Sequence, residues 1–107
     1  MTQISTQQIN QCHLIQNEMS LNSFKENLSR LTSQGDSLLF LNDGLFMLIK
    51  KDFKNDEFKQ LTHHLSLNAI DEQIESRAIS KLMGSINEIN FSEFVALTQN
   101  CKKVISW

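Results

Sequence analysis

Short apolar stretches alternate with helical patterns along the chain, and this alternation limits the folds that it can adopt. Residues 37–41 are apolar from Leu38 onward, which is typical of a strand buried on both faces. Strands are predicted for four segments, each followed by a helical segment: residues 12–16, 37–41, 65–70 and 86–89. Repeated strand and helix units predict a single small α/β domain, in which a mostly parallel sheet of four to five strands carries helices on both faces.

The first predicted helix begins near Leu21, where apolar residues recur on one helical face. Ser23 and Glu26 fit the capping-box pattern near its start, and Gly35 suits the position just past its end. A short helix or helical turn is expected over residues 45–50. These signals place one helix between the first two strands and a shorter one after the second.

Two further helices are expected in the second half of the chain. Asp71 is predicted to cap a helix that runs to about Leu82 and stops at Gly84. Asn90 and Glu93 form a second capping-box pair at the start of the last helix. The following residues lie along one face of that helix: Phe91, Phe94, Val95, Thr98 and Cys101.

The size of the chain suits one domain. It has 107 residues, of which 40% are hydrophobic and 21% charged. We predict an N-terminal extension over residues 1–11 and the α/β domain over residues 12–107. A domain of this size buries only about two-thirds of its unfolded surface, so packing against other subunits would add stability. Oligomer formation is therefore an expectation.

Charge and hydropathy argue against several classes of function. The net charge is −2 and the pI is about 5.9, whereas a nucleic-acid-binding domain normally carries a basic stripe and a higher pI. No apolar stretch reaches the roughly 20 residues needed to span a bilayer, and the polar N-terminus does not resemble a secretory signal. We predict a cytoplasmic protein that contacts neither nucleic acid nor membrane directly.

The sequence "LNDGLF", residues 41–46, separates two apolar stretches. A phosphate-binding loop after a strand needs several glycines, and this segment has one. Asp43 better suits a helix cap, and Gly44 a tight turn at the carboxyl edge of the sheet, where open α/β sheets place their sites. The apolar residues that follow either contact a partner subunit or fill the chain's own core: Leu45, Phe46 and Met47.

The two cysteines, Cys12 and Cys101, lie far apart in the sequence, and reduced thiols are expected. A thiolate that attacks a persulfide must be accessible and have a lowered pKa. Cys12 would open the first strand, where a thiol is usually buried. Cys101 would end a helix, whose partial negative charge opposes a thiolate, although Lys102 and Lys103 act the other way. Structural roles are expected for both, with Cys101 as the minority candidate for a reactive thiol.

Neither the histidines nor the clustered acids predict a site. The chain has three histidines: His13, His63 and His64. Their spacing matches no common metal site, and neighbouring histidines in a strand would point to opposite faces. Asp71, Glu72 and Glu75 fall in the first turn of a predicted helix, where the helix dipole favours acids. No metal and no cofactor are expected.

Three stretches together resemble the TusB/DsrH family of small sulfur-relay proteins: "SQGDSLLFLNDGL", "LNAIDEQIESRAI" and "INFSEFVALTQNCKKVISW". The resemblance runs from about His13 to Trp107. It rests on ordered features: Gly-Asp before an apolar strand, Asp-Gly after it, a strand entering an acidic turn with an arginine one helix later, and Phe-Val-x-Leu-Thr before a final tryptophan. Ala78 departs from the family, which usually has an Arg-Gly pair there.

The resemblance implies a DsrE-like fold and membership of a heterohexamer with two copies each of three related subunits. In the Tus branch, TusC-like and TusD-like partners complete a complex that passes persulfide sulfur toward 2-thiolation of the tRNA wobble uridine, through downstream sulfur carriers. In the Dsr branch, the complex serves sulfur oxidation. In both branches the principal acceptor cysteine belongs to the TusD/DsrE-type partner.

One departure from the family pattern bears on function. DsrH-type members resemble one another in carrying a cysteine in the first helix, and the position counted back from Gly35 is Leu28. Since leucine cannot carry sulfur, we expect a TusB-like subunit that is not catalytic alone and completes the oligomer around a partner's cysteine. The alternative is a DsrH-like sulfur acceptor that uses Cys101. A third hypothesis, a free-standing small-ligand protein of flavodoxin-like shape, ranks below both because the phosphate-binding loop is missing.

The candidate subunit interface combines the corner after the second predicted strand with the last residue: Asp43, Gly44, Leu45, Phe46, Met47 and Trp107. A tryptophan left in water would lose roughly 2 to 3 kcal/mol of available burial. We therefore expect the side chain of Trp107 to be ordered and packed, either on the domain or at a subunit contact.

Overall fold

The computed structural model describes residues 10–50, 53, 56–77, 79 and 86–107. Five strands form one sheet in the order β4-β3-β2-β1-β5, and every neighbouring pair is parallel. The strands are β1 (Gln11–Ile15), β2 (Ser37–Phe40), β3 (Ser66–Ile70), β4 (Ile86–Ile89) and β5 (Lys103–Ser106). The predicted α/β domain with a parallel sheet is confirmed. Of the predicted N-terminal extension, only the last two residues lie in the described part, and the second of them already belongs to β1.

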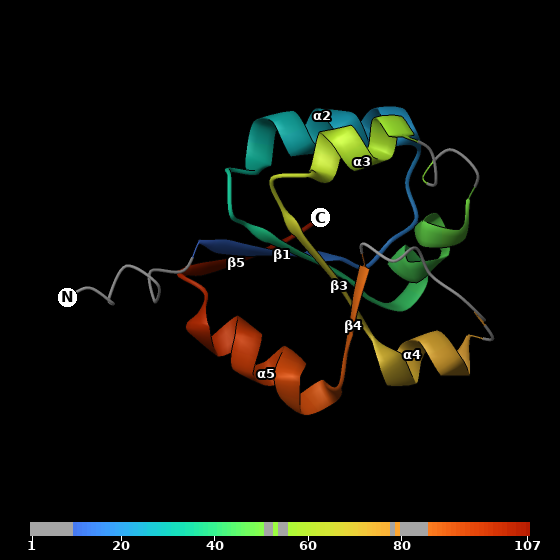
Figure 1. The fold of residues 1–107 in the computed structure, drawn as a ribbon, viewed down its shortest axis with the longest axis vertical. Coiled ribbons are helices and arrows are strands. Elements are labelled where there is room, and N and C mark those ends of the chain that lie inside the picture. The colour runs from blue at the N-terminus through green and yellow to red at the C-terminus, as the bar shows by residue number, and fades with distance from the viewer. Residues whose placement is uncertain (1–9, 51–52, 54–55, 78, 80–85) are drawn as a thin grey trace.

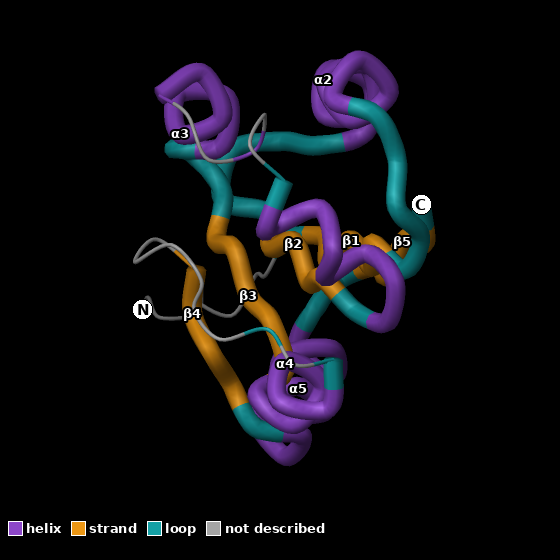
Figure 2. The backbone as a smooth tube through the Cα atoms, turned by 90° about the vertical axis from the view of Figure 1, so that its right-hand side faces the viewer, coloured by secondary structure: helices purple, strands orange, loops and turns teal. Residues whose placement is uncertain are grey.

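Helices cover both faces of the sheet. Figures 1 and 2 show α2 and α3 on one side and α4 and α5 on the other. The helical segments are α2 (Leu21–Leu31), the 3₁₀ helix η1 (Asn42–Ile49), α3 (Asp56–Thr62), α4 (Asp71–Ser76) and α5 (Phe91–Asn100). Among the described residues, no helix is long and apolar enough to cross a membrane.

The hydrophobic core lies between the sheet and the layer of α2 and α3. Side chains alternate between the two faces of each strand, so every second residue of β1, β2 and β3 points into this core. Phe24 of α2 contacts the rings of Phe40, Phe53 and Phe58. The buried cluster contains fifteen residues: Ile15, Phe24, Leu28, Leu38, Phe40, Leu45, Met47, Leu48, Phe53, Phe58, Leu67, Ala69, Ile74, Ile79 and Ile86.

The opposite face, which α5 covers, is more polar. Cys12 and Leu39 are fully buried there, and Asn68 is 4% exposed. The Asn68 side-chain amide donates to the Ser66 hydroxyl oxygen at 3.2 Å and accepts a hydrogen bond from Asn87 at 3.4 Å. Amide hydrogen bonds therefore occupy part of this layer, whereas the buried polar pair of the other layer, His13 and Asp36, lies beside a large hydrophobic cluster.

The strand β5 was not predicted. It lies beside β1, with Cys12 opposite Val104 and His13 opposite Ile105. As a result β1 becomes an interior strand, flanked by β2 and β5. Only two of the four residues of β5 are apolar, so the sequence signal for a strand is weak there.

Two helix starts illustrate how local sequence sets the elements. The Asn90–Glu93 capping box is confirmed, because each side chain accepts a hydrogen bond of 2.8 Å from the backbone N–H of the other residue. For α2 the predicted cap was wrong. Ser20 is the N-cap, and its hydroxyl oxygen accepts from the backbone N–H of Ser23, which lies inside the helix.

The helix α4 is shorter than predicted. It ends at Ser76, and Ile70 precedes it without a side-chain cap, so Asp71 is the first helical residue and not the cap. The expected end near Leu82 and the stop at Gly84 lie outside the described residues, as does Ala78.

At the corner after β2, the chain passes close to the end of β1. Gly44 lies against the Ile15 carbonyl group, where a Cβ atom would overlap with the carbonyl oxygen. The residue with positive φ is Asn42, at 51°, and not the glycine. Asp43 lies in the first turn of η1, but the N-cap is Leu41, so the predicted capping role of Asp43 was wrong. Glycine is thus required at position 44 because of the available space.

Candidate functional site

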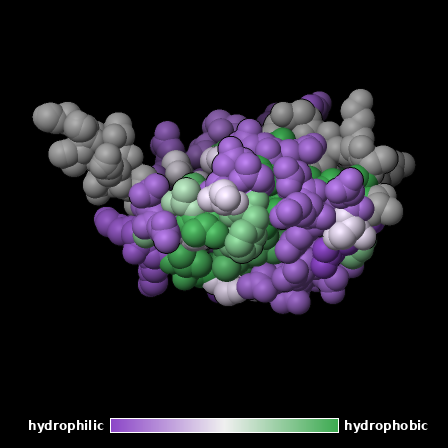
Figure 3. Space-filling view, turned by 90° about the horizontal axis from the view of Figure 1, so that it is seen from below, coloured by the Kyte–Doolittle hydropathy of each residue, from purple (hydrophilic) through white to green (hydrophobic). Residues whose placement is uncertain are grey.

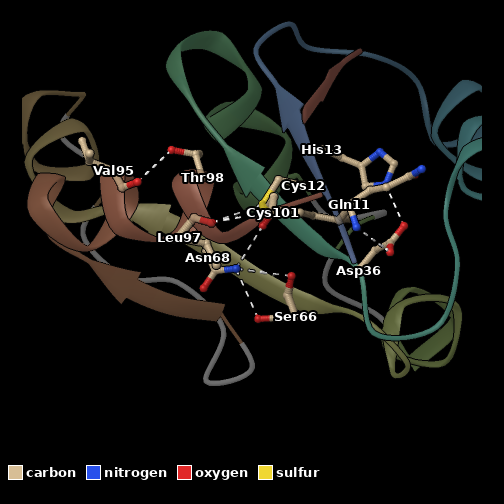
Figure 4. The surroundings of a disulfide bond; sticks show 11 residues. Gln11, Cys12, His13, Asp36, Ser66, Asn68, Val95, Leu97, Thr98 and Cys101 are labelled. Carbon is tan, nitrogen blue, oxygen red and sulfur yellow. Dashed lines mark hydrogen bonds and ion pairs between the residues drawn. A yellow bond between two sulfur atoms is a disulfide. The ribbon is translucent and has the colours of Figure 1, made fainter. Parts of the chain in front are cut away.

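The two cysteines meet on the α5 side of the sheet, which is called the lower layer, and the α2 and α3 side is called the upper layer. Cys12 on β1 and Cys101 at the C-cap of α5 form a disulfide with a Cα–Cα distance of 5.9 Å, although 89 positions separate them. Figure 4 shows the bond between the sheet and the end of the helix. The expectation of two reduced thiols is therefore wrong for this structure. It failed because the pairing depends on β5, which brings the end of α5 back to β1.

The two cysteine residues differ in exposure. Cys12 is fully buried, as predicted, whereas Cys101 is half-buried at the end of its helix. The Leu97 carbonyl oxygen lies 3.2 Å from the Cys101 sulfur and 3.9 Å from the Cys12 sulfur. The exposed residues Lys102 and Lys103 follow Cys101 directly. Of the two cysteines, only Cys101 therefore has surface in contact with solvent.

The helix α5 has no buried residue. Phe91 is 57% exposed and packs its ring against Phe94, at 5.8 Å between centroids. Val104 on the neighbouring strand is 44% exposed. Figure 3 shows apolar surface gathered on the face of the molecule that carries α5. This helix covers the sheet while leaving much of its own apolar surface in water.

On the other face of β1, His13 links the sheet to Trp107. The His13 Nε2 atom lies 2.9 Å from Asp36 Oδ2, and Trp107 Nε1–H donates to His13 Nδ1 at 3.0 Å. Since the indole can only donate, His13 Nδ1 is the acceptor and Nε2 carries the proton that Asp36 accepts. The predicted packing of Trp107 is confirmed, and its partners lie on the domain itself.

Asp36 completes this network. Its carboxylate also accepts from the backbone N–H of Gln11 at 3.1 Å and of Ser33 at 2.9 Å. Both Asp36 and His13 are at most 1% exposed. With both imidazole nitrogens occupied and no path to solvent, His13 has no free lone pair for a metal or a substrate. The network holds the strands and the last residue together.

The other histidines lie in a turn. His63 and His64 lie in the turn after α3 and not within a strand, and their rings meet edge to face at 5.5 Å between centroids. In the described part of the chain, no three histidine, cysteine or acidic side chains are grouped closely enough to hold a metal ion.

An open cleft of about 560 Å³ lies at the carboxyl ends of β3 and β4. Ile74 and Ile79 form its apolar part. Among the described residues, its polar lining is acidic or neutral: Asp71, Glu72, Glu75, Glu88 and Asn90. Four carboxylates repel a phosphate or carboxylate ligand, so the described lining of this cleft is unsuited to the anions that many open α/β sheets bind at such an edge.

The candidate interface residues are divided between the core and the surface. Leu45 and Met47 are fully buried in the core and Gly44 is buried, so the corner mainly fills the chain's own interior. Asp43 is exposed, and Phe46 and Trp107 are half-buried. For these three an interface role stays a prediction.

The comparison with known families covers most of the chain. The family described as DsrH like protein matches residues 19–104. The chain belongs to the DsrH family. Among curated proteins, none matches the sequence at a significant level. The matched part includes Cys101 but not Cys12 or Trp107, so family membership does not account for the disulfide or for the tryptophan that contacts His13.

Sequence reasoning missed two features of this region, the disulfide and the Asp36–His13 pair. A signal for the second existed, because His13 is a polar residue inside an apolar strand and needs a buried partner. The register explains which partner it finds. Cys12 lies opposite Ser37, which places Asp36 just ahead of β2 and within reach of His13.

Proposed function

We propose that this chain is a TusB-like, non-catalytic subunit of a cytoplasmic heterohexameric sulfur-relay complex. Its partners in the proposal are TusC-like and TusD-like subunits, and the complex supports 2-thiolation of the tRNA wobble uridine. Membership of the DsrH family supports a subunit role in sulfur relay. In the proposal, the chain itself contacts no tRNA, and sulfur reaches the tRNA through downstream carriers.

Leu28 is the observation that carries the proposal. Its side chain is 6% exposed and belongs to the hydrophobic core beneath α2. By resemblance, this position is where DsrH-type members have a cysteine, and a buried hydrocarbon cannot accept sulfur. Both cysteines of the chain are joined to each other, so the oxidised protein has no thiolate to offer. The acceptor thiol is therefore assigned to a partner.

The exposed apolar surface of α5 supports a role as a subunit. Phe91 and Val104 place large side chains in water on one face of a small domain, and clustered apolar surface of this kind is typical of protein contacts. Asp43, Phe46 and Trp107 remain the proposed contacts at the corner and at the last strand.

The test is complementation in a cell that lacks the chain, with 2-thiouridine in tRNA measured by mass spectrometry. Cys12→Ala and Cys101→Ala are each expected to restore 2-thiouridine, provided that the variant still co-purifies with the TusC-like and TusD-like subunits. Alanine is used because a buried serine hydroxyl without a partner costs about 1 to 3 kcal/mol and would confuse stability with chemistry.

The second candidate is a DsrH-like subunit that accepts sulfur on Cys101. The half-exposed position of Cys101 favours it, because reduction of the disulfide would place a thiol near the surface. This candidate would replace the first if Cys101→Ala assembles normally, thiolation stops, and the unmutated protein carries a persulfide on Cys101.

A further inference from the structure

The disulfide connects a fully buried cysteine to a partly exposed one, and this asymmetry suggests a reaction. We infer that Cys12 and Cys101 form a thiol–disulfide exchange site for small anionic thiols such as glutathione, in which Cys101 is the attacked sulfur and Cys12 is the resolving one. The inference concerns the isolated chain and does not depend on the proposed sulfur-relay role.

Access decides which sulfur reacts first. Exchange requires a thiolate to approach a sulfur atom directly, so a sulfur without exposed surface is protected in the folded state. Cys12 is fully buried in the interior strand β1, whereas Cys101 is half-buried at the end of α5. An incoming thiolate therefore attacks Cys101, and Cys12 leaves.

The balanced reaction runs in both directions. During reduction, a glutathione thiolate forms a bond to the Cys101 sulfur, the Cys12–Cys101 bond breaks, and its electron pair stays on Cys12, which takes up a proton. A second glutathione thiolate then attacks the glutathione sulfur of this adduct and releases Cys101 as a thiolate together with glutathione disulfide. During oxidation, the Cys101 thiolate attacks glutathione disulfide and releases one glutathione, and the Cys12 thiolate displaces the other from Cys101.

The geometry favours rapid resolution. The Cα atoms are 5.9 Å apart, near the commonest separation in protein disulfides, and β1 is fixed between β2 and β5. Cys12 is therefore held next to any adduct on Cys101. In the reduced chain, the Cys101 thiol can donate to the Leu97 carbonyl oxygen, which lies 3.2 Å from its sulfur.

The local charge selects the class of thiol. Lys102 and Lys103 follow Cys101 in the sequence and are exposed, with Lys103 on the opposite face of the sheet from Cys12, and glutathione carries a net negative charge at neutral pH. Their attraction acts against the partial negative charge of the helix end. Because both lysines lie in solvent, the preference for an anionic thiol is expected to weaken as salt is added.

Reduction has a structural consequence for α5. No residue of this helix is buried, and the disulfide adds a covalent cross-link between its C-cap and β1 to the backbone that continues from α5 into β5. Breaking the bond leaves α5 held by half-buried side chains, so its amides should exchange with solvent more readily. The redox state of the two cysteines therefore controls how firmly α5 is held against the sheet.

The main experiment uses the full chain, with glutathione disulfide as the probe and intact mass as the measurement. Glutathione disulfide is added under native conditions to three reduced proteins: the unmutated chain, Cys12→Ala and Cys101→Ala. Cys12→Ala should retain one glutathione on Cys101, whereas Cys101→Ala should acquire one at least about ten times more slowly, because Cys12 is buried. The unmutated chain should convert to the internal disulfide without accumulating an adduct.

Two results would overturn the inference: equal rates of modification in the two variants, or a stable glutathione adduct on the unmutated chain. A measurement without any variant covers the case in which one of them does not fold. The reduced unmutated chain is alkylated in short pulses, and peptide mapping should find Cys101 labelled at least about ten times faster than Cys12. Equal labelling would count equally against the inference.

Two controls address the charge and the helix. Lys102→Ala combined with Lys103→Ala should slow reduction by glutathione more than reduction by 2-mercaptoethanol, because the attacking thiolate of glutathione carries additional negative charge, and an equal effect on both would exclude selection by charge. Hydrogen exchange of the oxidised and reduced chains should differ in α5 and agree in α2, and unchanged exchange in α5 would exclude the structural consequence.

Discussion

The two layers that flank the sheet are held in different ways. The layer of α2 and α3 presents Phe24 and Leu28 to a continuous hydrophobic core, with polar residues on its outer side. The layer of α5 has apolar residues but no buried one, and it is joined to the sheet by a disulfide above a pair of hydrogen-bonded asparagines. One layer depends on burial, and the other on a covalent bond and on polar contacts.

This difference means that apolar composition does not predict how much a helix buries. The sequence of α5 is more apolar than that of α2, yet α2 supplies the core. What decides is the spacing, because α2 places its large side chains on one face and polar residues elsewhere. An apolar helix that keeps its surface in water is suited to a contact outside its own domain.

The largest expected effect separates the two layers with a matched pair of phenylalanines. Phe24→Ala should lower the free energy of unfolding by about 3 to 5 kcal/mol, because it opens a cavity beside three buried rings. Phe94→Ala, in the half-buried helix α5, should cost only about 1 kcal/mol. Urea denaturation gives both values. Equal losses would mean that the two layers contribute alike.

The second effect tests the covalent bond. Reducing the disulfide of the unmutated chain should lower the free energy of unfolding by about 2 to 4 kcal/mol, because the bond closes a long loop and so restricts the unfolded chain. The Cys12→Ala variant measured with and without reductant is the control, since it has no bond to lose. If the reduced and oxidised unmutated chains unfold at the same urea concentration, the lower layer does not depend on the disulfide.

The third effect tests the polar network at the edge of the upper layer. Asp36→Asn keeps the shape of the side chain but replaces one acceptor oxygen by an NH₂ group. That group faces either the donors of His13 and Ser33 or the backbone N–H of Gln11. We expect a loss of about 1 to 3 kcal/mol, measured by thermal unfolding, because buried donors lose their acceptor. Asp43→Asn is the exposed control and should change little. A neutral result at Asp36 would contradict the assigned hydrogen bonds.

The smallest effect concerns one hydrogen bond. Trp107→Phe retains ring packing on Phe24 but removes the donor to His13 Nδ1. A cost of about 1 kcal/mol is expected. In the nuclear magnetic resonance spectrum of the unmutated chain, the indole N–H should exchange slowly with solvent. Rapid exchange of that proton, together with unchanged stability of the variant, would show that the bond does not form in solution.

The order of strands and helices could be predicted because each element carries its own local signal. The apolar strand at 37–41, the Asn90–Glu93 cap and the alternation of elements all depend on residues within a few positions of one another. The errors at the starts of α2 and α4 concern boundary residues, because Ser20 and not Ser23 caps α2, and α4 begins after Ile70 without a side-chain cap. Local sequence therefore predicted the fold class but not every helix end.

The features of the candidate site could not be predicted in this way, because they join distant segments. The disulfide spans 89 positions, and the pairs Asp36–His13 and Trp107–His13 depend on the register of β1 with β2 and β5. Since β5 was not recognised, neither the disulfide nor the contact of Trp107 with His13 could follow from the sequence. The position of Leu28 in the core, by contrast, followed from its helical spacing alone.

The pairing of β1 with β5 has a mechanical consequence. The two strands are parallel, so pulling outward at Asn10 and Trp107 moves them along their length in opposite directions and loads their hydrogen bonds in shear, all at once. In the oxidised chain the disulfide then carries the load, and only residues outside 12–101 can lengthen. After reduction the whole domain can extend. The redox state would thus decide whether tension on this chain ends at a short tether or unravels the fold.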